Sequence, residues 1–110
     1  MGTVRPQDVV GAHAGAAYEV VLGGAPHAVA SARMEGDAGG GWPTLVAAMR
    51  DAASLPPLSG AMLGPSGEFA EIEVRAAGPV PMRLAANLTS YSQRSGGVEL
   101  TLRIVGAARA

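Results

Sequence analysis

Three stretches in the second half of the sequence alternate between apolar and other residues, and this pattern constrains the fold most. They are residues 70–74, 80–88 and 98–104. Apolar side chains at every second position place one face of a strand on a core and the other toward water or a partner. Because the three stretches follow one another closely, with turn-forming residues between them, we expect an antiparallel meander. Pro79 and Pro81 cannot donate ladder hydrogen bonds, which suggests a sheet edge at that point.

The first half of the chain contains the signals of a β-hairpin. Residues 18–22 have the composition of a strand, with Tyr18, Val20 and Leu22 on one face. Gly23, Gly24 and Pro26 follow, and such residues favour a turn. Residues 27–34 then return as a second strand that is rich in alanine.

One helix is predicted between this hairpin and the meander. Residues 35–41 contain three consecutive glycines, which indicates a loop, and Trp42 and Pro43 follow it. Proline is favoured in the first turn of a helix, where its missing N–H would be unpaired anyway. After it, four apolar residues fall on one stripe at helical spacing: Leu45, Ala48, Met49 and Ala52.

These segments predict an α+β fold that is mainly antiparallel β, in the order β-β-α-β-β-β, with one short helix packed on the sheet. The architecture would be a two-layer domain or a small sandwich. We expect residues 1–16 to form an N-terminal arm, with a short turn of helix near residues 7–10. Residues 17–106 would be a single mainly-β domain, and residues 107–110 a C-terminal tail.

The composition argues against several classes of protein. The formal charge is −1 and no basic cluster is visible, which disfavours nucleic-acid binding. No run reaches the roughly 18 to 20 apolar residues of a membrane-spanning helix, and the start lacks the pattern of a secretory signal. Cysteine is absent, which excludes disulfides and thiolate metal sites. We therefore expect no nucleic-acid or membrane partner.

No arrangement of residues in the sequence points to catalysis. His13 and His27 lack the spacing of a metal pair, and a surface or hydrogen-bonding role fits them better. Glu71 and Glu73 could form an acid/base pair, but the solvated face of a strand, with Arg75 as a partner, is the simpler interpretation. The sequence thus predicts a protein that is no enzyme, with no catalytic, cofactor-binding or metal-binding residues.

Some residues remain as candidates for an interface with another protein. Trp42 is either a lid on the core or an exposed anchor for a neighbouring subunit, and we favour the core. The outward face of the meander strands carries further polar candidates. The full set of candidate interface residues is Trp42, Glu71, Glu73, Arg83 and Arg103.

Residues 18–53 resemble a module of structural proteins from tailed bacteriophages. The shared parts are a strand that begins with Tyr18, a turn at Gly23-Gly24, Gly36-Asp37, and an Ala-rich segment at residues 45–49 that is a helix in the module. Residues 38–41 are an insertion relative to that module. The resemblance implies a tail, baseplate or head–tail connector component of the virion, assembled in the bacterial cytoplasm. Its partners would be copies of itself, as a homo-oligomer, and other particle proteins, without a cofactor.

Two hypotheses about function follow. A particle subunit would use residues 1–16 to contact a neighbouring chain and would have much of its polar strand face covered. The alternative is a small stand-alone binding or accessory domain, such as an inhibitor or a ligand-binding module. That alternative predicts a concave apolar pocket lined by Trp42, Met49 and Met62.

Overall fold

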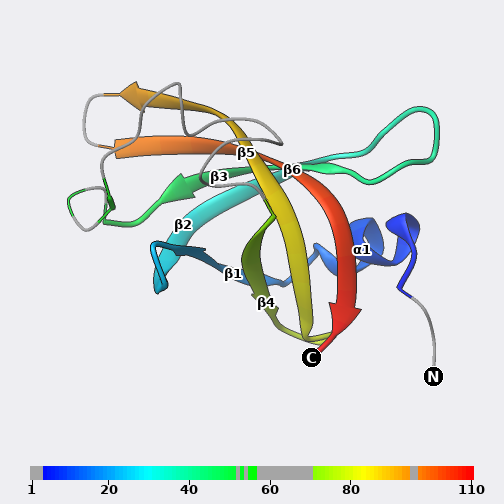
Figure 1. The fold of residues 1–110 in the computed structure, drawn as a ribbon. Coiled ribbons are helices and arrows are strands. Elements are labelled where there is room, and N and C mark those ends of the chain that lie inside the picture. The colour runs from blue at the N-terminus through cyan, green and yellow to red at the C-terminus, as the bar shows by residue number, and fades with distance from the viewer. Residues whose placement is uncertain (1–3, 52, 54, 57–70, 95–96) are drawn as a thin grey trace.

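The computed structural model describes residues 4–51, 53, 55–56, 71–94 and 97–110, which form a barrel of antiparallel strands with a short helix beside it (Figure 1). The strands close in the order β1-β2-β3-β6-β5-β4. The elements are α1 (Pro6–Ala12), β1 (Ala17–Leu22), β2 (Ala25–Glu35), β3 (Thr44–Met49), β4 (Ile72–Ala77), β5 (Met82–Arg94) and β6 (Gly97–Arg109).

The meander predicted for the second half of the chain is confirmed, although residue 70 lies outside the described residues and Val80 precedes β5 and is 38% exposed. β4 pairs antiparallel with β5, and β5 pairs antiparallel with β6. The alternating apolar residues point inward, and each of the following is at most 3% exposed: Val74, Met82, Leu84, Ala86, Leu88, Leu100, Leu102 and Ile104. Burying a Val, Leu, Ile or Met side chain contributes about 1.5–3 kcal/mol, and the residues of this alternation make up half of the core cluster.

The predicted hairpin of the first half is also confirmed. β1 and β2 pair antiparallel from Leu22↔Ala25 to Glu19↔Ala28. The two residues between them, Gly23 and Gly24, both have positive φ, 60° and 81°. A two-residue hairpin turn with both angles positive matches the twist of the strands, and glycine adopts it without a steric cost.

The predicted helix at residues 42–53 is wrong, because residues 44–49 form strand β3. β3 lies between β2 and β6 and pairs antiparallel with both. A six-residue apolar run is too short to separate helical from strand periodicity, and Leu45 and Met49 are buried in either case. β-branched Thr44 and Val46 favour a strand, and pairing on two sides satisfies the backbone. Among the described residues the element order is therefore α-β-β-β-β-β-β.

The predicted two-layer or sandwich arrangement is replaced by a closed barrel. Closure comes from β4, which pairs with β5 on one side and with β1 on the other, from Ala17↔Ala77 to Val20↔Val74. Pro79 and Pro81 lie in the connection between β4 and β5 and mark no sheet edge. In that connection they cost no ladder hydrogen bond.

Both ends of the chain contribute to the folded body. A helix does form near residues 7–10, as α1, and its Val9 is 3% exposed within the core, as is Val4 at 5%. At the other end β6 continues through Arg109, which pairs with Met82, so residues 107–109 belong to the barrel. Contact of residues 1–16 with a neighbouring chain stays a prediction.

Candidate functional site

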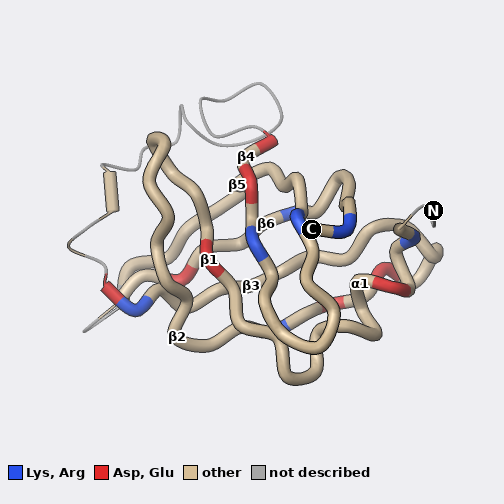
Figure 2. The backbone as a smooth tube through the Cα atoms, turned by 90° about the horizontal axis from the view of Figure 1, so that it is seen from below, with Lys and Arg blue, Asp and Glu red and all other residues tan. Residues whose placement is uncertain are grey.

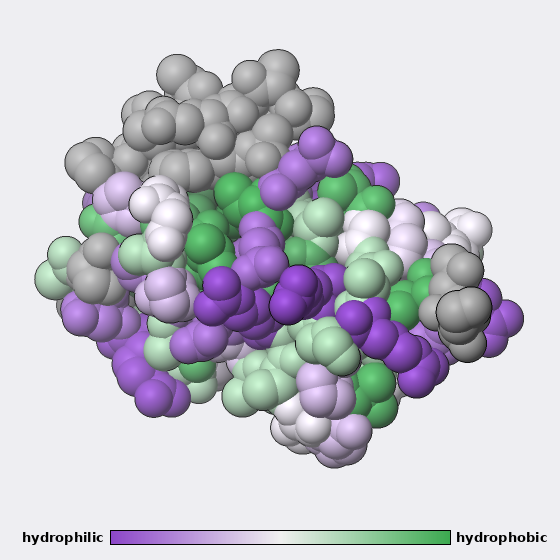
Figure 3. Space-filling view, turned by 60° about the horizontal axis from the view of Figure 1, so that its bottom comes forward, coloured by the Kyte–Doolittle hydropathy of each residue, from purple (hydrophilic) through white to green (hydrophobic). Residues whose placement is uncertain are grey.

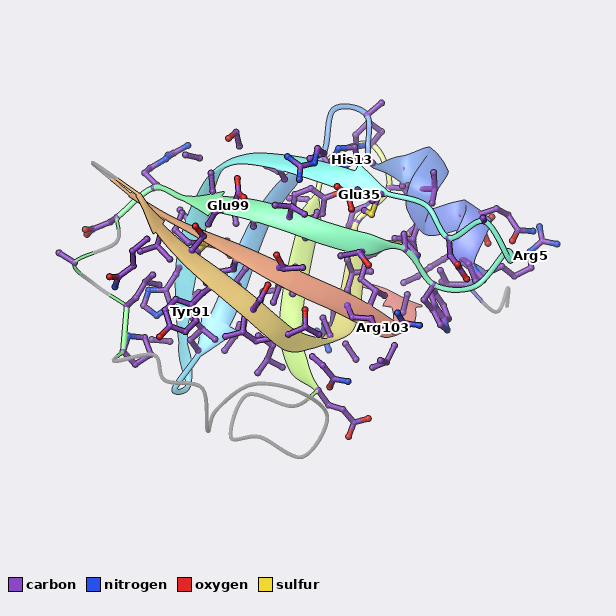
Figure 4. All side chains as sticks on the ribbon, turned by 90° about the horizontal axis from the view of Figure 1, so that it is seen from above. Arg5, His13, Glu35, Tyr91, Glu99 and Arg103 are labelled. Carbon is purple, nitrogen blue, oxygen red and sulfur yellow. The ribbon has the colours of Figure 1, made fainter. Side chains whose placement is uncertain are left out.

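The sequence-predicted interface residues do not form one patch. Glu71, Glu73 and Arg83 line a shallow hollow of about 340 Å³ beside the end of β6. Arg103 lies further along β6, where its Cα neighbours are Thr44 and Asn87 (Figure 4). Trp42 precedes β3 and is half-buried against the core, which agrees with its interpretation as part of the core.

Glu71 has a structural role that the sequence does not reveal. It is the only non-glycine residue with positive φ in the described part of the chain, at 50°. Its backbone N–H donates a hydrogen bond of 2.8 Å to the Oδ1 of Asn87, a side chain that is 8% exposed. Asn87 thereby fixes the chain where it enters β4. Asn87 carries no pattern that would have indicated this from sequence.

The acid and base pairing predicted near Glu73 is confirmed for Arg75. The Nε of Arg75 lies 2.6 Å from the Oε2 of Glu73, and both side chains are partly exposed. Exposed pairs of this kind contribute about 0–1 kcal/mol. The pair therefore lies on a partly exposed strand face, as the simpler interpretation predicts.

A groove of about 710 Å³ crosses the barrel on the side of β1, β4 and the start of β5. Alanine side chains line much of it, and its charged lining residues are Glu19, Arg50, Glu73, Arg75 and Arg83. Figure 2 shows acidic and basic positions interleaved along these strands, and Figure 3 shows hydrophilic residues gathered in a band across this face. Three arginines against two glutamates leave the lining weakly basic.

The apolar pocket predicted around Trp42, Met49 and Met62 does not coincide with the groove beside β1 and β4. The 710 Å³ groove includes neither Trp42 nor Met49 in its lining, and Met62 lies outside the described residues. Met49 is instead buried at 5% exposure as part of the core. The apolar residues that suggested a ligand pocket are thus core residues where the structure describes them.

The four strands β2, β3, β6 and β5 lie side by side and form a sheet that extends beyond the closed part of the barrel (Figure 4). The pairing of β1 with β2 ends at Ala28, and that of β4 with β5 ends at Ala86. Beyond Ala28 no described residue pairs with β2 on its β1 side. Within the described chain, β2 thus has an open edge, whereas residues 57–70, which precede β4, lie outside the described residues.

A β-bulge lies close to the point where β2 separates from β1, and another where β5 separates from β4. The β2 ladder shifts register between Val29 and Ser31, and the β5 ladder shifts between Leu88 and Ser90. Bulges bend a strand and increase its twist. Here they lie where the two strands leave the closed part of the barrel.

The ladders place residues of the four strands in level rows. Ser31 pairs with Ala48, Ala48 with Glu99, and Glu99 with Ser92, so Ser31 and Ser92 lie at opposite ends of one row. A second row links Arg33, Val46, Thr101 and Ser90. The row between these two contains the core residues Ala47 and Leu100, and the row beyond the second contains the core residues Leu45, Leu102 and Leu88. Apart from Val46, the outward face of these rows thus carries small or polar side chains.

The two histidines take part in hydrogen bonds or packing. The Nδ1 of His13 lies 2.7 Å from the hydroxyl oxygen of Tyr18, and the two rings stack. Burial raises the pKa of Tyr18 to about 12. His27 is 8% exposed within β2 and has an interaction partner. Among the described residues, no three His, Asp or Glu side chains come together in a way that could hold a metal ion.

Comparison with known proteins found no match among family models, curated proteins or solved structures. None of the helices in the described ranges is long and apolar enough to cross a membrane.

Proposed function

We propose that this protein is a non-enzymatic structural subunit that repeats in a larger particle and acts through protein–protein contacts. The observation that carries the proposal is the edge of β2 beyond Ala28, with which no described residue pairs on the β1 side. Soluble monomers usually shorten, charge or cover such edges, because exposed N–H and C=O groups recruit other strands. An edge of this kind suits a subunit that contacts a strand of a neighbouring chain.

The charges of the sheet are compatible with close packing of copies. On the β2 edge, Arg33 and Glu35 neutralise each other through a contact of 3.0 Å. On the β5 edge, Ser90 and Ser92 are exposed and uncharged. With a formal charge of −1 for the whole chain, repulsion between copies is weak.

A bacteriophage or phage-like particle is the setting that we propose, as a tail, baseplate or head–tail connector component. Support comes from the strand, glycine turn and strand of residues 18–34, which the phage module shares and which here form β1 and β2. The helix of that module has no counterpart, since residues 44–49 are β3. On this proposal the partners are further copies and other particle proteins, and the protein resides in the virion after assembly in the bacterial cytoplasm.

A second candidate function is a stand-alone binding domain, which the 710 Å³ groove favours. Arg50 and Arg83 line it without a carboxylate within salt-bridge distance among the described residues. A carboxylate-bearing ligand would suit these guanidinium groups. A thermal-shift screen of dicarboxylates and acidic peptides, with Arg83→Ala as the control, tests this function.

Size-exclusion chromatography with light scattering over a series of concentrations tests the assembly proposal. We expect the mass to rise above the 11.0 kDa of one chain toward a fixed multiple, and rings or stacks in negative-stain micrographs. A monodisperse species of one chain at every concentration up to the solubility limit would contradict the proposal.

A further inference from the structure

Two arginines face each other across neighbouring strands in the lining of the 710 Å³ groove. The ladder places Arg75 of β4 directly opposite Arg83 of β5, and both residues are exposed. Like charges directly opposite each other in an antiparallel pair are destabilising. Arg75 is compensated by Glu73 at 2.6 Å, whereas no described carboxylate lies within salt-bridge distance of Arg83. A carboxylate from another molecule would neutralise the charge of Arg83.

The groove has room for a segment of another chain. Alanines line it on several strands, and a second hollow of about 390 Å³ adjoins it. The two share four lining residues: Ala17, Tyr18, Val29 and Arg50. The second hollow also borders residues 29–32 of β2, where the edge of that strand is open. A segment that enters the groove can therefore also reach the β2 edge.

The connection between β2 and β3 is a projecting loop that is already folded into a turn. Residues 36–43 form this β2–β3 loop, which extends beyond the barrel (Figure 1), and residues 36–40 are exposed. Two hydrogen bonds of 3.0 Å fix the turn. The carbonyl oxygen of Asp37 accepts from the N–H of Gly40, and the Oδ2 of Asp37 accepts from the N–H of Gly41. A preformed loop loses less conformational entropy when it binds.

Asp37 carries the charge that would neutralise Arg83. Other carboxylates already contact an arginine of their own chain, namely those of Asp8, Glu35 and Glu73. No described arginine lies within salt-bridge distance of Asp37. The loop thus presents an uncompensated carboxylate, and the groove presents an uncompensated guanidinium group.

We infer that the β2–β3 loop of one copy enters the groove of the next copy, where the carboxylate of Asp37 pairs with the guanidinium group of Arg83. This inference rests on the proposed function and names the surfaces that assembly uses. The loop and the groove are different surfaces, so the contact is head to tail and every copy offers one of each. Repetition of such a contact closes a ring when the rotation between copies allows it, and otherwise gives an open stack.

A double-mutant cycle tests the charge pair. Arg83→Ala removes the guanidinium group, and Asp37→Asn removes the charge but keeps a side-chain oxygen that can accept from Gly41. Each change should weaken association by about tenfold or more in a light-scattering concentration series, because charge pairs enclosed in an interface are strongly coupled. The double variant should associate no more weakly than the weaker single variant, since both changes break one contact. Arg103→Ala, which is exposed and outside the groove, is the matched control and should leave association unchanged.

A disulfide test places the loop in the groove directly, because the chain has no cysteine that could interfere. Ala38→Cys lies next to Asp37 in the loop, and Ala28→Cys and Ala77→Cys lie in the groove lining, all at exposed positions. Mild oxidation of the loop variant mixed with a groove variant should give a cross-linked dimer for at least one of the two mixtures. Each variant alone should remain uncross-linked. Gln93→Cys, which is exposed and outside the groove, is the control and should not react with the loop variant.

The outcomes separate this inference from the proposed function. If an oligomer forms but the two charge variants have no effect or act independently, or the loop variant cross-links with neither groove variant, the contact is wrong and the structural role stands. If Arg83→Ala weakens the oligomer and Asp37→Asn does not, another acidic segment occupies the groove and the assignment of the loop is wrong. If the protein stays a single chain at every concentration, both proposals fail. Coupled charge variants together with cross-linking of the mixtures support both.

Discussion

The Nδ1 of His13 lies 2.7 Å from the hydroxyl oxygen of Tyr18, and the two rings stack with their centroids 5.7 Å apart. His13 is the C-cap residue of α1, whereas Tyr18 lies in β1 with 6% of its surface exposed. The pair thus ties the N-terminal helix to the barrel. Both residues also line a hollow of about 390 Å³ beside β2.

Tyr18→Phe should destabilise the fold modestly at neutral pH. The change removes the hydrogen bond to His13 but keeps the ring and its packing. We expect a loss of about 0.5–1.5 kcal/mol in the free energy of unfolding, measured by urea denaturation. Tyr18→Ala, which also removes the buried ring, should cost about 3–5 kcal/mol, and equal effects of the two changes would contradict this assignment.

Stability should fall at alkaline pH because of the same residue. Burial raises the pKa of Tyr18 from 10.0 to about 12, so above pH 10 the unfolded chain loses the phenolic proton before the folded chain does. The stabilisation is fully present below pH 10 and is lost as the pH rises to 12. At 1.36 kcal/mol for each tenfold change in proton affinity, the loss reaches at most about 2–3 kcal/mol. Urea denaturation across this interval should show it, with a smaller slope for Tyr18→Phe.

Val9 and Val10 allow a matched test of whether the N-terminal helix belongs to the core. Both lie in α1, but Val9 is 3% exposed and Val10 is 43% exposed. Val9→Ala should lower the free energy of unfolding by about 1.5–2.5 kcal/mol, because it removes two buried carbons. Val10→Ala should change it by less than about 0.5 kcal/mol. A free arm would show equally small effects for both.

Gly78 should tolerate no side chain. Its φ is 151°, and a Cβ built there would lie 3.1 Å from the carbonyl oxygen of Gly15 and 3.2 Å from the Cα of Ala16. Gly78→Ala should therefore cost about 1–3 kcal/mol in thermal or urea unfolding. Gly106→Ala is the control, because a Cβ there meets nothing within 4 Å. A neutral Gly78→Ala would show that the segment at residues 15–16 can move away from the β4–β5 connection.

Period-two alternation allowed most of the strands to be predicted from sequence, because it directly records which side of a strand is buried. It identified β4, β5 and β6, and Gly23-Gly24 with its flanking residues identified the β1–β2 hairpin. Closure of the barrel was not predictable, since the pairing of β1 with β4 joins residues 17–20 to residues 74–77. A local sequence pattern cannot indicate a pairing between two strands that lie so far apart in the chain.

The interface candidates were predictable only as exposed polar residues. Glu73 and Arg83 were identified because they lie on the outward face of alternating strands, but alternation does not report which strand edges are open. That property depends on where the pairing with β1 and β4 stops, at Ala28 and Ala86. Ser31 and Ser92, the ends of one row, carry no sequence signal of their own.

Residues 44–49 were wrongly predicted to be helical, and a substitution at Ala48 tests the strand directly. Ala48 is half-buried on the outward side of β3, between Ser31 and Glu99. In a helix, Ala48→Thr would lower stability by up to about 0.7 kcal/mol, because β-branched residues are poorer helix formers than alanine. In a strand the same change should be neutral or stabilising, within about 1 kcal/mol. Ala48→Gly is the reference, since glycine weakens helix and strand alike, and urea denaturation of the three proteins decides by the sign of the threonine effect.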